Sequence, residues 1–198
     1  MSTSMLSIVT QITLLIHLLI FAFVLVSVLK EDYTLITSNK INIVELQNTA
    51  KLTSLSLFVL WLTGAFLLYL KPGLDLQGII DSPKLATKVT VVTLLTINGL
   101  IMHLVAFPKI LNPSANTSCS ASLVCVLGVI SSVSWVYASF VGAARVVASM
   151  MTYELFLALY LAPLISGIVF ALIVVRPHLQ KLLAQRHKLL LTQSNFTY

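Results

Sequence analysis

The sequence feature that most constrains the fold is the apolar stretch at residues 11–29, QITLLIHLLIFAFVLVSVL, which contains no charged residue. About 20 apolar residues in a helix, at about 1.5 Å per residue, cross the roughly 30 Å hydrocarbon core of a bilayer. Apart from Gln11 at its first position, the one strongly polar side chain in this stretch is His17, near its middle. A polar side chain at that depth is costly and needs a partner, so the stretch predicts a membrane-spanning helix that carries one functional candidate.

Four further apolar runs follow, at residues 52–70, 86–107, 119–142 and 154–175. Lys30, Glu31 and Asp32 are expected to end the first span, and Pro108 is expected to end the third. The chain is 58% hydrophobic and 9% charged, far below the roughly 25% charged residues of soluble domains. The sequence therefore predicts an all-α, polytopic membrane helix bundle of about five transmembrane helices, formed by residues 1–176.

The last segment, residues 177–198, is basic and alternates charged residues with leucines, which predicts an amphipathic helix on the cytoplasmic side. The net charge of +6 does not indicate nucleic-acid binding, because no stretch interleaves basic with aromatic residues. In a membrane protein such charge sets the topology.

Five spans place the two termini on opposite sides of the membrane. If the N-terminus is outside, the inner segments hold eight Lys and Arg residues and the outer segments hold four. The inner eight are Lys30, Lys40, Lys51, Lys109, Arg176, Lys181, Arg186 and Lys188, and the outer four are Lys71, Lys84, Lys88 and Arg145. The positive-inside rule therefore predicts an N-terminus outside and a C-terminus in the cytoplasm. We expect the protein in the inner (plasma) membrane.

Small residues recur every four positions in the fourth run, at Ser134, Ala138 and Gly142. A stripe of this kind lets helix backbones approach closely. We expect it to face another helix, in this chain, in a second copy or in another membrane subunit.

Two histidines are candidate metal ligands, His17 near mid-depth and His103 near the inner end of the third run. By residue count, His103 lies about 9 Å from the middle of its span, so the two rings are not expected at one level. A single axial ligand, His17, is geometrically easier than a two-histidine clamp. Lys88 and Arg145 lie in the proposed outer half, where they could pair with acidic groups of a ligand.

Trp61 and Trp135 lie at central depths suited to flank a flat macrocycle. They complete the set of candidate cofactor-binding residues.

The order of His17 in Leu-Ile-His-Leu, Gly64 in Leu-Thr-Gly and Lys88 in Ala-Thr-Lys-Val resembles small bacterial membrane proteins related to the copper-resistance D and protoporphyrinogen-oxidase-like group. In the tetrapyrrole-handling members, a first-span histidine and a third-span lysine are the functional positions. The resemblance thus implies that His17 and Lys88 contact a haem b or a related tetrapyrrole.

Three functions remain open at this point. The first is a tetrapyrrole-binding membrane protein, either redox-active or handling haem precursors. The second is a permease for a small solute or metal, and the third is a non-catalytic accessory subunit of a larger membrane complex.

Overall fold

The computed structural model describes residues 3–70, 76–113, 116–144 and 150–195, and these residues form helices and short connections without a strand. The helices are α1 (Thr3–Thr37), α2 (Ile43–Tyr69), α3 (Leu76–Ile80), α4 (Pro83–Ile101), α5 (Phe107–Leu111), α6 (Thr117–Ala143), α7 (Tyr153–Phe170) and α8 (Arg176–Asn195). One π-helical turn (Met102–Ala106) joins α4 to α5, and another (Ala171–Val175) joins α7 to α8. The predicted all-α helix bundle is confirmed.

Five helices of the described chain are long and apolar enough to cross a membrane. They are Ser4–Thr37, Ile43–Tyr69, Pro83–Leu111, Thr117–Ala143 and Tyr153–Thr192. Large apolar side chains cover much of their outer surface, for example Leu19, Phe58 and Ile173, each more than 60% exposed. A surface of this kind is typical of an integral membrane protein, as the sequence predicted.

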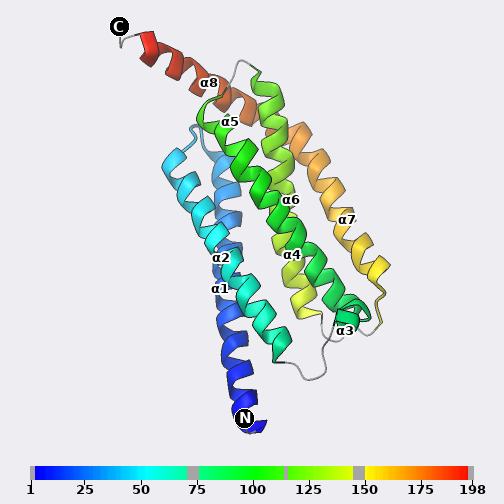
Figure 1. The fold of residues 1–198 in the computed structure, drawn as a ribbon. Coiled ribbons are helices and arrows are strands. Elements are labelled where there is room, and N and C mark those ends of the chain that lie inside the picture. The colour runs from blue at the N-terminus through cyan, green and yellow to red at the C-terminus, as the bar shows by residue number, and fades with distance from the viewer. Residues whose placement is uncertain (1–2, 71–75, 114–115, 145–149, 196–198) are drawn as a thin grey trace.

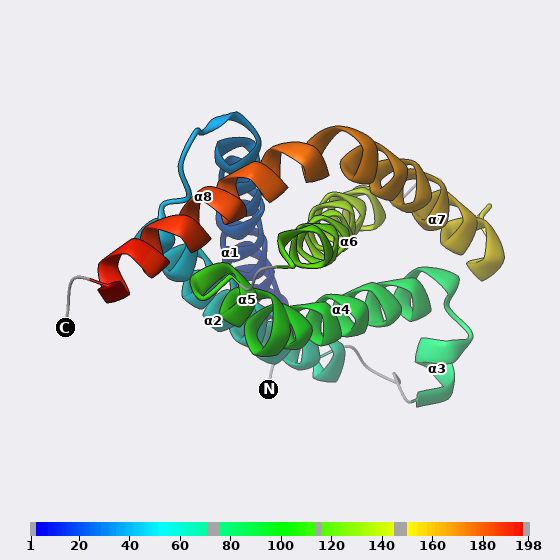
Figure 2. The same ribbon diagram turned by 90° about the horizontal axis from the view of Figure 1, so that it is seen from above.

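Helix α6 is the centre of the bundle. It packs against α1, α4, α7 and α8, while α1 and α2 pair as a hairpin. Figure 2 shows α6 enclosed by these neighbours, and Figure 1 shows the two termini at opposite ends of the molecule. Helix α6 accordingly carries several of the most deeply buried side chains, including Ser134, Trp135 and Val141.

The N-terminal ends of two helices follow the capping rules. The Asn42 side chain accepts a hydrogen bond from the Glu45 amide at the start of α2. Ser82 does the same for the Leu85 amide at the start of α4, with Pro83 in the first turn.

The end of α1 differs from the prediction. The helix continues through Lys30, Glu31 and Asp32 and ends at Thr37. Glu31 and Asp32 do not stop it, because each finds a hydroxyl partner on a neighbouring helix, Thr49 of α2 and Ser132 of α6.

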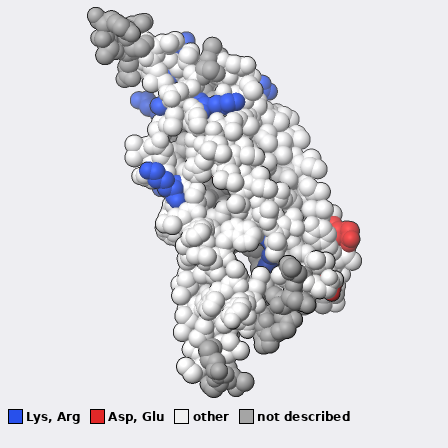
Figure 3. Space-filling view, viewed as in Figure 1, with Lys and Arg blue, Asp and Glu red and all other residues white. Residues whose placement is uncertain are grey.

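Positive charge is unequally divided between the two ends of the bundle, which we call the α8 end and the α3 end. On the face shown in Figure 3, most lysine and arginine side chains gather where α5 and α8 lie. By position on the helices, eight of the described Lys and Arg residues belong to the α8 end, the same eight that the sequence assigned to the inner side. Lys84 and Lys88 belong to the α3 end, and Lys71 and Arg145 lie outside the described residues.

The small-residue stripe of α6 packs mainly against helix α7 of the same chain. Ser134 is fully buried and its hydroxyl lies 2.9 Å from the Tyr160 hydroxyl of α7. Ala138 packs against the same cluster of α6 and α7 side chains. Gly142 is exposed, with open space where a Cβ would lie. Ser134 is therefore not available to a second copy or to another subunit.

Candidate functional site

His17 lies between α1 and α2, half-buried, with its imidazole against the backbone of Gly64. A Cβ at Gly64 would lie 3.6 Å from His17 Cε1, so glycine leaves this close approach unhindered. The His17 Nδ1 atom lies 2.7 Å from the Thr63 hydroxyl oxygen. That hydroxyl also donates to the Val59 carbonyl, at 2.8 Å.

The Thr63 hydroxyl has only one hydrogen, and the Val59 carbonyl can only accept it. With that hydrogen directed to the Val59 carbonyl, Thr63 accepts from the Nδ1–H of His17, an assignment that leaves the lone pair on Nε2. A histidine that binds a metal through one ring nitrogen characteristically donates its other N–H to a fixed acceptor. The geometry at His17 has this form.

Lys88 of α4 lies close enough to His17 for their charges to interact. The structure thus brings together the first-span histidine and the third-span lysine that the sequence singled out. Arg145, the third predicted polar contact, lies outside the described residues.

His103 lies on the π-helical turn after α4, at a different level from His17. Its Nε2 atom lies 2.7 Å from the Ser54 hydroxyl, and its ring packs edge-on against Phe107. His17 contacts Thr63 of α2, and His103 contacts Ser54 of the same helix. These two contacts are nine residues apart, which is about 13 Å along the helix axis. As predicted, the two rings are not at one level.

The two tryptophans occupy different places. The Trp61 indole N–H donates to the Thr96 hydroxyl at 3.0 Å and so links α2 to α4. Trp135 is 1% exposed and packs on Phe21 of α1, with ring centroids 5.5 Å apart. Phe21 follows His17 by one helical turn on the same face of α1. Trp135 therefore packs against the face of α1 that carries His17, whereas the contact described for Trp61 is with Thr96 of α4.

A second polar region was not predicted from sequence. A cavity of about 350 Å³ lies between α1, α2, α4, α6 and α7, in the half of the bundle toward the α8 end. Glu31 and Asp32 of α1 line it, next to their hydroxyl partners Thr49 and Ser132. Acidic residues after an apolar run look like the end of a span, and nothing in the sequence reveals that these two turn inward.

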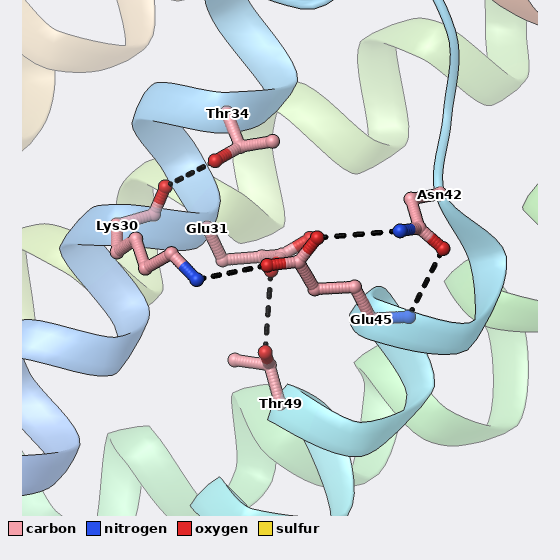
Figure 4. A network of polar contacts seen from close by, with 6 residues as sticks. All are labelled: Lys30, Glu31, Thr34, Asn42, Glu45 and Thr49. Atoms are coloured by element: carbon pink, nitrogen blue, oxygen red, sulfur yellow. Dashed lines mark hydrogen bonds and ion pairs between the residues drawn. The ribbon is translucent and has the colours of Figure 1, made fainter.

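Lys30, which precedes this pair on α1, is engaged by a third carboxylate. Figure 4 shows the Lys30 ammonium group directed at Glu45, at 2.9 Å, while Glu31 receives the Thr49 hydroxyl at 3.2 Å. Asn42 also donates to Glu45, at 3.3 Å.

No group of three or more His, Cys, Asp or Glu residues in the described part of the chain is placed to hold a metal ion. Comparison with protein-family models, with curated proteins and with solved structures found no match. The fold and the two polar regions define a polytopic helical membrane protein with ionisable groups in its interior.

Proposed function

We propose that this protein binds a haem or a related tetrapyrrole inside the membrane, with His17 as the axial ligand. The observation that carries the proposal is the orientation of His17, whose Nδ1–H is held by Thr63 while Nε2 is left to bind iron. Haem iron is commonly held by one such histidine.

Lys88 supports this assignment. A lysine close to the axial histidine can pair with a propionate, a charge-assisted contact of the stronger kind. The order of His17, Gly64 and Lys88 also resembles the tetrapyrrole-handling proteins of the copper-resistance D and protoporphyrinogen-oxidase-like group. The Gly64 backbone lies beside the imidazole, and a Cβ there would be in van der Waals contact with it, 3.6 Å from His17 Cε1.

The division of labour among the residues follows from their chemistry. A bound tetrapyrrole would supply the redox or ring chemistry. His17 would bind it, Thr63 would hold the imidazole in one tautomer, and Lys88 would neutralise an acidic substituent. Phe21 and Trp135 form an apolar wall one helical turn away from His17.

An absorption spectrum of the detergent-purified protein, with pigment extraction, tests the proposal. We expect a tetrapyrrole band in the wild-type protein. His17→Ala and His17→Gln should both remove it while the protein remains folded, because an amide does not replace an imidazole on iron. Thr63→Val should weaken retention of the pigment, since it removes the acceptor that orients the ring.

His103→Gln is the matched control, because it changes another intramembrane histidine with its own hydroxyl partner. It should leave the band unchanged. A colourless wild-type protein that takes up no added haem, or full pigment in His17→Gln, would contradict the proposal.

A further inference from the structure

We propose that the cavity toward the α8 end is a second binding site, and that it takes a small organic cation, an ammonium group on an apolar body. This proposal does not rest on the tetrapyrrole proposal, although Trp135 lines the cavity and also packs on Phe21 near His17. Asp32, which lines the cavity, is 15 residues from His17 on α1, about 22 Å along the helix.

The first argument is charge. Lys30, Glu31, Asp32 and Glu45 lie together and comprise one cation and three carboxylates. Lys30 forms its ion pair with Glu45, outside the cavity lining. Within the part of the chain that the structure describes, the contacts of Glu31 and Asp32 are hydroxyl groups rather than cations. Carboxylates in an apolar surrounding call for a positive partner.

The arginines described at the α8 end do not supply that partner. Arg176 donates to the Ser118 hydroxyl at 2.6 Å. Arg186 donates to the carbonyl oxygens of Ile110 and Leu111. Arg186 is thus used at a helix end, and Arg176, whose Nε has no hydrogen-bond partner among the described residues, does not line the cavity.

The second argument is an unpaired polar atom. Asn98 lines the cavity and is 5% exposed. Its amide nitrogen donates to the Leu127 carbonyl at 3.1 Å, but its amide oxygen has no hydrogen-bond partner in the described structure. Buried polar groups are almost always paired, and an exception requires an explanation. An N–H donor on a ligand would satisfy this oxygen.

Trp135 adds a donor to the same wall. It lines the cavity, and its indole N–H has no partner among the described residues. The cavity therefore offers two carboxylates, a free amide oxygen and a free indole N–H. His103, paired with the Ser54 hydroxyl, also lines it, and the rest of the wall is mainly aliphatic and aromatic.

The size and access of the cavity fit a small molecule. A volume of about 350 Å³ lies within the range of small-ligand pockets, roughly 300–1,000 Å³. Ile36 and Phe170 line the cavity and are also exposed on the outer surface, so it is not sealed. A bare divalent ion prefers six or more oxygen ligands and would leave the apolar walls unused.

Calorimetric titration of the detergent-purified full chain with benzylammonium, and separately with benzyl alcohol, tests the proposal. The two probes share an apolar body and differ in the ammonium group. We expect saturable binding of benzylammonium and at least tenfold weaker binding of benzyl alcohol. Asp32→Asn should weaken benzylammonium binding at least tenfold, and Glu31→Gln should act in the same direction.

Glu154→Gln is the control, because it removes one exposed carboxylate of the same kind at the other end of the bundle. It should leave the affinity unchanged. Unfolding temperatures identify variants that fail to fold. If Asp32→Asn does not fold, the benzylammonium affinity of Glu31→Gln tests the proposal in its place. The proposal is overturned if benzylammonium does not bind, if benzyl alcohol binds equally well, or if both carboxamide variants bind like the wild type.

The ammonium group could belong to a free solute or to a lipid headgroup, and nanodiscs of different composition separate the two. Benzylammonium affinity that is lower in phosphatidylethanolamine than in phosphatidylcholine nanodiscs, two lipids of equal net charge of which only the first has a primary amine, identifies the headgroup amine as the occupant. Equal affinity in both identifies a free amine. Either result requires the same site.

Discussion

The buried amide oxygen of Asn98 has no hydrogen-bond partner in the described structure. A substitution of Asn98 can therefore weaken ligand binding without lowering the stability of the fold. Leucine has a similar volume and removes the unpaired acceptor, which costs about 1–3 kcal/mol when buried. The bond to Leu127 that is lost contributes about 0.6 kcal/mol in a membrane interior. We therefore expect Asn98→Leu to melt at or above the wild-type temperature while binding benzylammonium more weakly, measured by thermal unfolding and calorimetry.

Ser134→Ala is the matched control for this prediction. Ser134 is also a buried polar residue, but its hydroxyl is paired, with the Ile130 carbonyl and with Tyr160. Its removal should lower the unfolding temperature and leave binding unchanged. A clear loss of stability in Asn98→Leu would mean that the amide serves the fold.

The residues that sequence reasoning could find were those that stand out locally. His17 and Lys88 interrupt apolar runs, and the structure places them within reach of each other. Asp32 and Ser132 could not be paired in advance, because they are 100 residues apart and each looks ordinary in its own segment. The cavity is a property of how α1 crosses α6, which no local pattern encodes.

At the scale of helices, two prolines that resemble stop signals lie inside continuous helices. Pro108 follows Phe107, whose amide bonds to the Met102 carbonyl five residues back. Pro177 follows Arg176, whose amide bonds in the same way to Ala171. A proline ring clashes with the carbonyl four residues before it, and widening the preceding turn by one residue removes the clash.

This arrangement corrects the expectation that Pro108 ends the third span, since the helix runs on to Leu111. Both π-helical turns also contribute side chains to the cavity, among them Met102 and Ala171. Neither π-helical turn was predicted from the sequence.

Gly167 tests the packing of α7 against α6. A Cβ at Gly167 would lie 2.9 Å from Val129 Cγ1, closer than atoms in contact can approach. We expect Gly167→Ala to lower stability by about 1–3 kcal/mol through overpacking, outweighing the gain in helix propensity of up to about 1 kcal/mol. Thermal unfolding in detergent measures the change.

Gly142→Ala provides the comparison, because nothing lies within 4 Å of its Cβ position. It should leave the unfolding temperature unchanged or raise it slightly. Combining Gly167→Ala with Val129→Ala should restore much of the loss, since it removes the clashing methyl group. Equal effects of the two glycine substitutions would show that α6 and α7 are not packed this closely.

At the scale of the whole molecule, the five spans were predictable because each is an apolar run of membrane length bounded by polar or proline-containing segments. Their packing order was not, since hydropathy does not specify neighbours. The structure places α6 at the centre and sets the two polar regions on α1 about 22 Å apart, His17 in one half and Asp32 in the other. A single long helix thus carries both candidate sites.

The charge asymmetry of the bundle predicts its orientation. Eight described Lys and Arg residues belong to the α8 end, against Lys84 and Lys88 at the α3 end, so by the positive-inside rule we expect the richer end in the cytoplasm. In a background with Cys119→Ser and Cys125→Ala, we expect an impermeant maleimide added to intact cells to label Ser4→Cys. Gln185→Cys, on the exposed side of α8, should be labelled only after the cells are opened. Labelling of both from the same side would contradict five spans. The opposite pattern would mean that the α8 end faces outward and that charge does not set the orientation of this chain.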